Sequence, residues 1–281
     1  MGHEVRLVPP VRAKAYVKRG RKNDAADAAA ICEAVTRPSM QCVPIKTVAQ
    51  QDALVLHRAR DLLVKQCTQL CNSIRGHLSE FGIIAAKGNA GYKTLLAVVG
   101  DHEDARLPTA ARGVLTLLAE QWQAATQRLD SLQRQIVLWH RGNEDSCRLA
   151  TVPQFGPIIA SALVAKVGDA TRFHRARDLS AWIGVVPSQH STAGKERLGH
   201  ITKAGDRYLR KLLMLAAMGM VRRAKAGRDV PPWLKELLAR KAPKLAAIAM
   251  ANKLARIAWV ILVRKETYKT PQQLEAAIGA A

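Results

Sequence analysis

The sequence has few aromatic residues, half as many acids as bases, and no long apolar run. Aromatic residues make up 4% of the 281 residues, and 22 Asp and Glu stand against 44 Lys and Arg. The longest apolar runs, 212–221 and 257–263, are much shorter than the roughly 20 residues that cross a bilayer. The first 22 residues lack the apolar core of a signal peptide. We therefore expect a soluble, cytoplasmic protein that does not bind a membrane.

Cysteine is also scarce. The chain contains five cysteines, an odd number, and none of them belongs to a CxxC pair. Cys67 and Cys71 lie four residues apart on a predicted helix, which is the spacing of half a metal site, but no His or Cys pair completes it. We expect free thiols and no structural zinc.

The excess of bases leaves a formal net charge of +22. A charge of this size predicts a polyanionic partner, and nucleic acid is the simplest one. A polybasic membrane-surface protein is the alternative, but such proteins gather their cations beside one apolar helix, whereas here the cations are spread along the chain.

Apolar periodicity predicts helix for almost everything after residue 45. Leucines recur every seven residues at 56, 63 and 70 within a predicted helix from about 48 to 81. In a second helix, apolar residues alternate spacings of three and four without error, at Leu115, Leu118, Trp122, Ala125, Leu129, Leu132, Ile136 and Trp139. This heptad seam predicts a left-handed helix pair, formed either as an antiparallel hairpin or as a coiled-coil dimer.

Three domains follow from the pattern: residues 1–46, a coiled-coil region 47–142, and a helical domain 143–281. In the first, a short strand at residues 4–8 leads through a basic connector to a helix that Asn23 caps and Pro38 ends. In the third, residues 148–170 resemble a helix-hairpin-helix element, with Pro157 at the first helical position after Gly156. Such an element points backbone N–H groups at a phosphate, and a plain helical hairpin is the alternative.

Residues 187–205 form a loop of small and basic residues with two adjacent hydroxyls, Ser191 and Thr192. A hydroxyl nucleophile among cations suits attack on a phosphate, because the cations stabilise the charge that develops. A solvated basic loop is the alternative. The cations that we expect to contact nucleic acid are Lys195, Arg197, Lys203, Arg207, Arg210 and Lys211.

Asp24 and Asp27 stand three residues apart, on one face of the predicted first helix. Two such carboxylates form half of a divalent-metal site. The alternative is that they complement the dipole at the start of the helix. Lys22 and the small alanines that follow would allow a phosphate backbone to approach closely.

The segments KNDAADAAAICEAV (22–35) and VPIKTVAQQDALVLHRARDLLVKQ (43–66) resemble the end of the RuvC-like domain of DEDD insertion-sequence transposases. GVVPSQHSTAGKERLGHITKAGDRYLRKLL (184–213) and PKLAAIAMANKLARIAWVILVRKETY (243–268) resemble the second domain of the same family. The resemblance covers essentially the whole chain, in the right order. It implies a mainly α fold: a remnant of an α/β RuvC-like (RNase H-like) domain, long coiled-coil helices, and a helical C-terminal domain.

The resemblance implies a DNA recombinase guided by a structured RNA that the mobile element encodes. In that family the acids hold Mg²⁺ or Mn²⁺, and a serine forms a covalent phosphoserine link to DNA. Asp24 and Asp27 match the third and fourth acids, and Ser191 matches the nucleophile, with Thr192 as the alternative. Lys22 and Gly156, together with the loop cations, would bind nucleic acid. The working unit would be a homo-oligomer, a dimer or tetramer, associated with the bacterial nucleoid.

The first Asp and the Glu of the family pattern should precede a segment like GHEVRLVPP, which stands here at residues 2–10. The resemblance therefore leads us to expect that this chain carries only two of the family's four metal-binding acids and binds metal weakly. We also expect that either the start of the protein has been assigned too late or the gene is a decayed copy. The alternative function is a truncated, catalytically inactive protein. It would bind the element's RNA or DNA and oligomerise with full-length relatives.

Overall fold

The computed structural model describes residues 2, 5–17, 23–38, 40, 42–190 and 197–269. It confirms the mainly α class: the described residues form eleven α-helices, one 3-10 helix and one two-stranded sheet. The chain divides into two compact units, Met1–Ala49 and Gln50–Ala281. Each unit is described by itself below.

The first unit contains α1 (Pro10–Ala13), a 3-10 helix η1 (Lys14–Tyr16) and α2 (Asp24–Thr36). The side chain of Asn23 accepts a hydrogen bond of 2.7 Å from the N–H of Ala26, so the predicted cap of α2 is confirmed. The strand predicted at residues 4–8 is reduced to one isolated antiparallel bridge, in which the N–H of Val43 donates to the carbonyl of Leu7. The residues on either side of this bridge form no further ladder in the described part of this unit.

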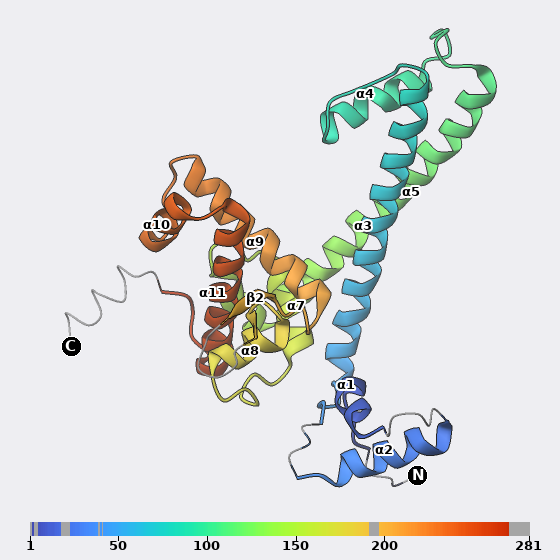
Figure 1. Cartoon of the computed structure of the whole chain (residues 1–281). Helices are drawn as coiled ribbons and strands as arrows, with labels where there is room; N and C mark the ends of the chain where they lie inside the picture. Colours follow the sequence, from blue (N-terminus) through green and yellow to red (C-terminus); the bar gives the residue numbers. More distant parts are fainter. Residues whose placement is uncertain are drawn as a thin grey trace. The chain divides into compact units, whose positions relative to one another are not determined.

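In the second unit, α3 (Val48–Glu80) and α5 (Thr109–Arg141) run antiparallel along each other (Figure 1). Trp139 near the end of α5 packs against Ala53 and Leu54 near the start of α3. At the other end, Ile74 and Leu78 share a buried cluster with Leu115. These contacts resolve the question left by the heptad pattern: the two helices pair within one chain. All eight seam residues of α5 are buried or half-buried.

Apolar periodicity did not set α4 (Asn89–Gly100) apart as a helix of its own. This helix lies at the end of the helix pair distant from the remaining helices (Figure 1). Tyr92, Leu95 and Val99 of α4 fill the core at this tip. The guanidinium of Arg112, only 6% exposed, donates to the carbonyls of Val98 and Val99 in the last turn of α4. It therefore satisfies carbonyls that a helix end leaves unpaired and complements the negative end of the dipole. Together α3, α4 and α5 are called the arm.

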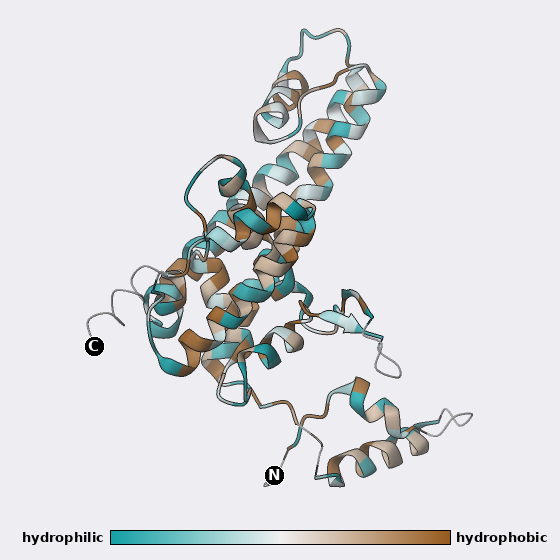
Figure 2. Ribbon diagram, turned by 60° about the vertical axis from the view of Figure 1, so that its left-hand side comes forward, coloured by the Kyte–Doolittle hydropathy of each residue, from teal (hydrophilic) through white to brown (hydrophobic). Residues whose placement is uncertain are grey.

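The remaining helices form a bundle around one large buried cluster. They are α6 (Glu144–Ala150), α7 (Pro157–Val167), α8 (Ala176–Ile183), α9 (Arg207–Lys225), α10 (Pro232–Arg240) and α11 (Pro243–Arg264). Figure 2 shows apolar segments concentrated where these helices meet. In sequence order α8 is followed by β1 (Pro187–Gln189) and β2 (Leu198–Ile201), which pair antiparallel with Pro187 opposite Ile201 and Gln189 opposite Leu198.

By length and composition, α11 is the one described helix that could cross a membrane. Its sequence contains no long uninterrupted apolar run, because Lys253 and Arg256 interrupt it. Its buried residues, which include Met250, Leu254 and Ile261, belong to the bundle core. This burial is that of a core helix.

Candidate functional site

The loop that carries the two predicted hydroxyls is the end of the β1–β2 hairpin. Ser191, Thr192 and Lys195 lie in the segment 191–196, outside the described residues. The two residues that flank this segment are held together, because the N–H of His190 donates to the carbonyl of Arg197 at 2.8 Å. Next to them, the hydroxyl of Ser188 lies 3.3 Å from His190 Nε2. The hairpin therefore brings residues 190 and 197 together at one place on the bundle.

Close backbone packing holds the base of this hairpin. Gly184 ends α8 with φ 80°, a conformation that favours glycine. A Cβ added at Gly205 would collide with the carbonyl of Trp182. Arg210 Nη1 donates to the carbonyls of Ile183 at 2.8 Å and Gly205 at 3.2 Å. Arg210 therefore ties α9 to the end of α8, a structural role that the sequence analysis did not assign.

The other predicted nucleic-acid contacts are placed as follows. The side chains of Arg197, Lys203 and Arg207 are exposed around the hairpin and the start of α9. Lys211 is also exposed and forms an ion pair with Asp61 at 3.0 Å. Lys22 lies outside the described residues. Phosphate contact by any of them stays a prediction.

The turn between α6 and α7 matches the expected capping, since Gly156 is the N-cap of α7 and Pro157 its first residue. The left-handed residue in this turn is Gln154, with φ 72°, whereas Gly156 has an ordinary φ of −88°. Gly156 is exposed, so the N-terminus of α7 is accessible from solvent. Whether this turn binds a phosphate, as a helix-hairpin-helix element does, stays a prediction.

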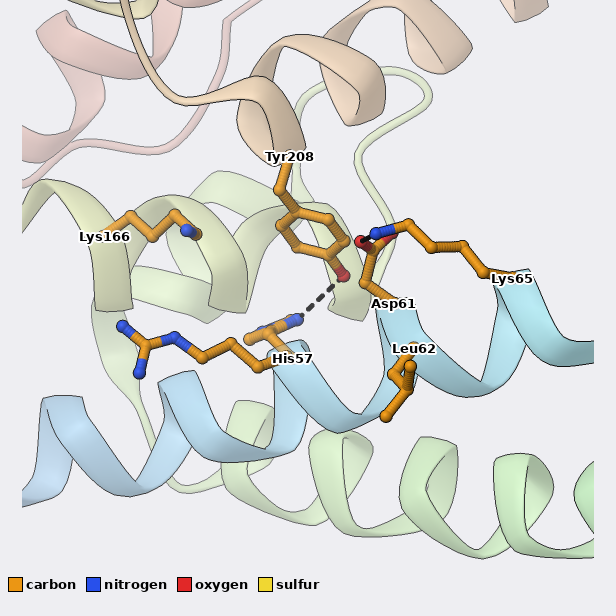
Figure 3. Close-up of a pocket in the computed structure, with 7 residues that line it drawn as sticks. His57, Asp61, Leu62, Lys65, Lys166 and Tyr208 are labelled. Atoms are coloured by element: carbon orange, nitrogen blue, oxygen red, sulfur yellow. Dashed lines mark hydrogen bonds and ion pairs between the residues drawn. The ribbon is translucent and has the colours of Figure 1, made fainter.

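A pocket of about 260 Å³ lies where α3, α7 and α9 meet (Figure 3). In Figure 3, His57 and Leu62 of α3 lie below the ring of Tyr208, Asp61 and Lys65 of α3 lie to its right, and Lys166 of α7 lies to its left. The lining residues are His57, Arg58, Asp61, Leu62, Lys65, Lys166 and Tyr208.

Hydrogen bonds connect Ser161 with two residues of the pocket wall, His57 and Tyr208. The hydroxyl of Ser161 donates to the carbonyl of Pro157 in the first turn of α7. His57 Nε2 lies 3.0 Å from that hydroxyl oxygen and its Nδ1 lies 3.2 Å from Tyr208 Oη. Because the Ser161 proton is already used, we assign the imidazole proton to Nε2, which leaves Nδ1 to accept from Tyr208. These hydrogen bonds thereby link all three helices through one neutral histidine.

Burial keeps that histidine neutral. Loss of solvent lowers the pKa of His57 to about 4, and the nearby charges of Arg60 and Lys166 act in the same direction. Burial also raises the pKa of Tyr208, so the phenol remains a hydrogen-bond donor at neutral pH. The acidic groups nearby are both paired with lysines. Asp61 pairs with Lys65 and Lys211, and the Nζ of Lys166 lies 2.5 Å from Asp206, whose carboxylate also caps α9.

The two acids predicted to bind metal lie in the first turn of α2, and both are exposed. A pair of carboxylates suits Mg²⁺ but fills only part of its coordination shell. Among the described residues, no group of three or more His, Cys, Asp or Glu side chains could hold a metal ion. Metal binding by Asp24 and Asp27 therefore stays a prediction, and these two carboxylates alone would fill only part of the shell.

The pocket between α3, α7 and α9 had no counterpart in the sequence analysis. Tyr208 lay within the quoted segment 184–213, but no spacing pattern connected it to His57, which is 151 residues away. The one usable signal is local. His57 occupies a buried position of a helix whose other buried residues near it are Ala53 and Leu54, and a buried polar side chain requires a partner.

Comparison with known proteins yields two family matches. Residues 146–231 match the family described as "Transposase IS116/IS110/IS902 family". Residues 1–83 match a second family, described as a transposase and belonging to the DEDD group of IS110 elements. The matches include the segments 22–35, 43–66 and 184–213, whose motifs resemble DEDD transposases.

Relatives extend this similarity to nearly the whole chain. A Sinorhizobium fredii protein named as a transposase is 47% identical over 95% of this chain and 69% of its own length. A Pseudomonas aeruginosa protein named as a family 20 transposase is 46% identical over 96% of this chain and 80% of its own. The transposase for insertion sequence element IS1111A of Coxiella burnetii is 40% identical over 96% of this chain and 74% of its own length. The chain therefore belongs to the IS116/IS110/IS902 family of insertion-sequence transposases.

Proposed function

We propose that this transposase cleaves and rejoins DNA through Ser191 under the guidance of an RNA encoded by its element. The observation that carries the proposal is the β1–β2 hairpin, whose His190–Arg197 hydrogen bond brackets the segment containing Ser191. The exposed cations Arg197, Lys203 and Arg207 stand directly before or shortly after β2 in the sequence. Cations in this position would stabilise the negative charge that develops on an attacked phosphate.

In the proposed step, the hydroxyl oxygen of Ser191 forms a bond to a backbone phosphorus. The bond from that phosphorus to one deoxyribose oxygen breaks, and the proton that Ser191 gives up passes, directly or through water, to the released strand, which leaves as a free hydroxyl. The covalent phosphoserine keeps the energy of the broken linkage. A strand hydroxyl from the target then attacks the phosphoserine, restores a phosphodiester and frees Ser191. Thr192 is the alternative nucleophile.

Asp24 and Asp27 would hold a Mg²⁺ or Mn²⁺ ion, which would supply charge stabilisation at the phosphate. Since both carboxylates are exposed in the first turn of α2, they are available to share an ion with other acids. We expect metal binding by these two residues alone to be weak.

The pocket between α3, α7 and α9 is a further candidate site for a backbone phosphate, although Asp61 also lines it and Lys166 is paired with Asp206. Lys166 and Tyr208 lie on its wall, and Arg58 adds an exposed cation. Lys22, Lys211 and the α7 N-terminus at Gly156 would add further phosphate contacts. The protein would act on nucleoid DNA in the cytoplasm as a homodimer or homotetramer.

A second candidate is a protein that binds the element's RNA or DNA, forms mixed oligomers with its relatives and performs no strand chemistry. The observation in its favour is that the described residues contain no group of three metal-ligating side chains. Strand exchange by the purified chain that depends on Mg²⁺ would support the enzyme. Nucleic-acid binding without any strand exchange would support the second candidate.

The nucleophile can be tested by trapping the covalent intermediate. We expect Ser191→Ala to abolish the protein–DNA adduct that survives denaturation, with little change in DNA affinity. Thr192→Ala is the matched control, because it removes a neighbouring hydroxyl and should keep the adduct. An adduct that persists in Ser191→Ala and disappears in Thr192→Ala would overturn the assignment to Ser191.

A further inference from the structure

A second pocket lies in the arm, away from the bundle that carries the hairpin. Its volume is about 480 Å³, within the range of pockets that hold small ligands. It is lined by α3, by the loop before α4, by α4 and by α5. Its polar and aromatic lining residues include Asn72, Arg75, Lys87, Tyr92 and Trp122.

Two aromatic rings form one wall of this pocket. Tyr92 of α4 meets Trp122 of α5 edge-on, with ring centroids 4.5 Å apart. Aromatic residues make up only 4% of the chain, so a pair at one pocket is a concentrated apolar surface. An indole that is only half-buried retains ring surface that can stack on a planar ligand.

The same wall contains a polar group without a partner. Tyr92 is 2% exposed, and its hydroxyl is buried without a hydrogen-bond partner among the described residues. Burial also raises the pKa of this phenol, so the group keeps its proton and remains a donor. A buried donor without a partner is uncommon in folded proteins. Because this oxygen is enclosed by protein, Tyr92 contributes to the pocket through its ring.

The rim of the pocket is cationic. Arg75 Nη1 donates to the carbonyls of Ala85 and Ala86, both at 3.0 Å, which fixes the guanidinium beside the loop. Lys87 on that loop is exposed, and Asn72 places an exposed amide on α3. The lining residues include no Asp or Glu. A ring surface, an amide and two cations match a base, its hydrogen-bonding edge and its phosphate.

We propose that this pocket binds an unpaired nucleotide of a single-stranded nucleic acid, with the base on Trp122 and the phosphate at Lys87 and Arg75. Duplex bases are stacked and paired, so they cannot enter a pocket of this kind. RNA and single-stranded DNA share the required chemistry, and the experiment separates them. The inference rests on the proposed function only in taking nucleic acid as the partner. It requires no strand chemistry.

The test measures affinity of the full chain for a 12-nucleotide single strand, as RNA and as DNA, and for the matching duplex. We expect Trp122→Leu to weaken single-strand binding by about tenfold, because it removes one stacking surface. Trp122→Phe should retain most of the affinity. A thermal melt of each variant establishes that the arm is folded. Loss with RNA, with DNA or with both supports the pocket and names the strand that it binds.

Lysine variants give a control that does not touch the core. Lys87→Glu reverses a charge at the rim, and Lys93→Glu makes the same change at an exposed position of α4 that does not line the pocket. We expect Lys87→Glu to weaken single-strand binding several times more than Lys93→Glu. Photo-crosslinks from 4-thiouridine in the RNA strand, or from 4-thiothymidine in the DNA strand, should map to the peptides that contain Trp122 or Tyr92.

Equal effects of the two lysine variants, or crosslinks confined to other peptides, would overturn the proposal. These results are independent of the Ser191 experiment. If the chain forms the covalent DNA adduct but Trp122→Leu leaves single-strand binding unchanged, the nucleotide pocket is rejected and the proposed function stands. If the chain forms no adduct but Trp122→Leu weakens single-strand binding, the pocket stands and the proposed function is rejected.

Discussion

The bundle and the arm are built from the same kind of helix but hold together differently. The bundle surrounds one large cluster to which helices α6 to α11 all contribute buried or half-buried residues. The arm has a narrow seam between two long helices and a small separate cluster at its tip. Stability should therefore be cooperative in the bundle and more local in the arm. Substitutions of exposed polar residues in the arm should therefore leave the stability of the bundle unchanged.

The largest effect is expected from a cavity in the bundle. Leu254 of α11 is 1% exposed and belongs to the main cluster. We expect Leu254→Ala to lower the free energy of unfolding by about 3–4 kcal/mol, because it removes buried methyl groups and leaves a cavity. Chemical denaturation monitored by circular dichroism measures the change. A loss below about 1 kcal/mol would show that the bundle core is looser than its burial indicates.

The junction between arm and bundle should respond to pH through His57. Its pKa falls from 6.5 to about 4 in the folded chain. Above pH 6.5 the imidazole is neutral in both states, whereas below it only the unfolded chain takes up the proton. Stability should therefore fall as pH drops from 6.5 to 4, by about 3 kcal/mol in all. His57→Gln should remove this part of the pH dependence, and an unchanged pH profile in that variant would contradict the assignment.

A local effect is expected at the tip of the arm. Arg112→Met removes the guanidinium that donates to four carbonyls, those of Val98, Val99, Asp104 and Leu107. We expect a loss of about 2–3 kcal/mol, since the carbonyls lose charge-assisted hydrogen bonds. Hydrogen exchange should accelerate in α4 and leave α11 unchanged. Acceleration in both would show that arm and bundle unfold together.

The smallest effect on stability is expected at the rim of the α3–α7–α9 pocket. Lys65 pairs with Asp61 at 2.7 Å, but its side chain is 60% exposed, so Lys65→Gln should change stability by less than about 0.5 kcal/mol. If Lys65 contacts a phosphate, the slope of log affinity against log salt should decrease by about one. The matched variant Lys235→Gln, on α10, should leave that slope unchanged.

Local sequence patterns predicted much of the secondary structure. Apolar spacing placed α5, and the Asn23 side chain placed the start of α2, because each of these depends on neighbouring residues. The case of α4 shows the limit of this reasoning. Its core residues Tyr92, Leu95 and Val99 are recognisable as one face only once α3 and α5 are paired.

The positions of Ser191, Asp24 and Asp27 in the chain, the heptad seam and the positive charge were all present in the primary sequence. Tertiary packing alone decided that the seam closes within one chain, that Arg210 ties α9 to α8, and that His57 meets Tyr208 and Ser161. The physical reason is distance along the chain. Helix periodicity and capping act over a few residues, whereas the hydrogen bonds of His57 join residues 104 and 151 positions apart and exist only after the helices have docked.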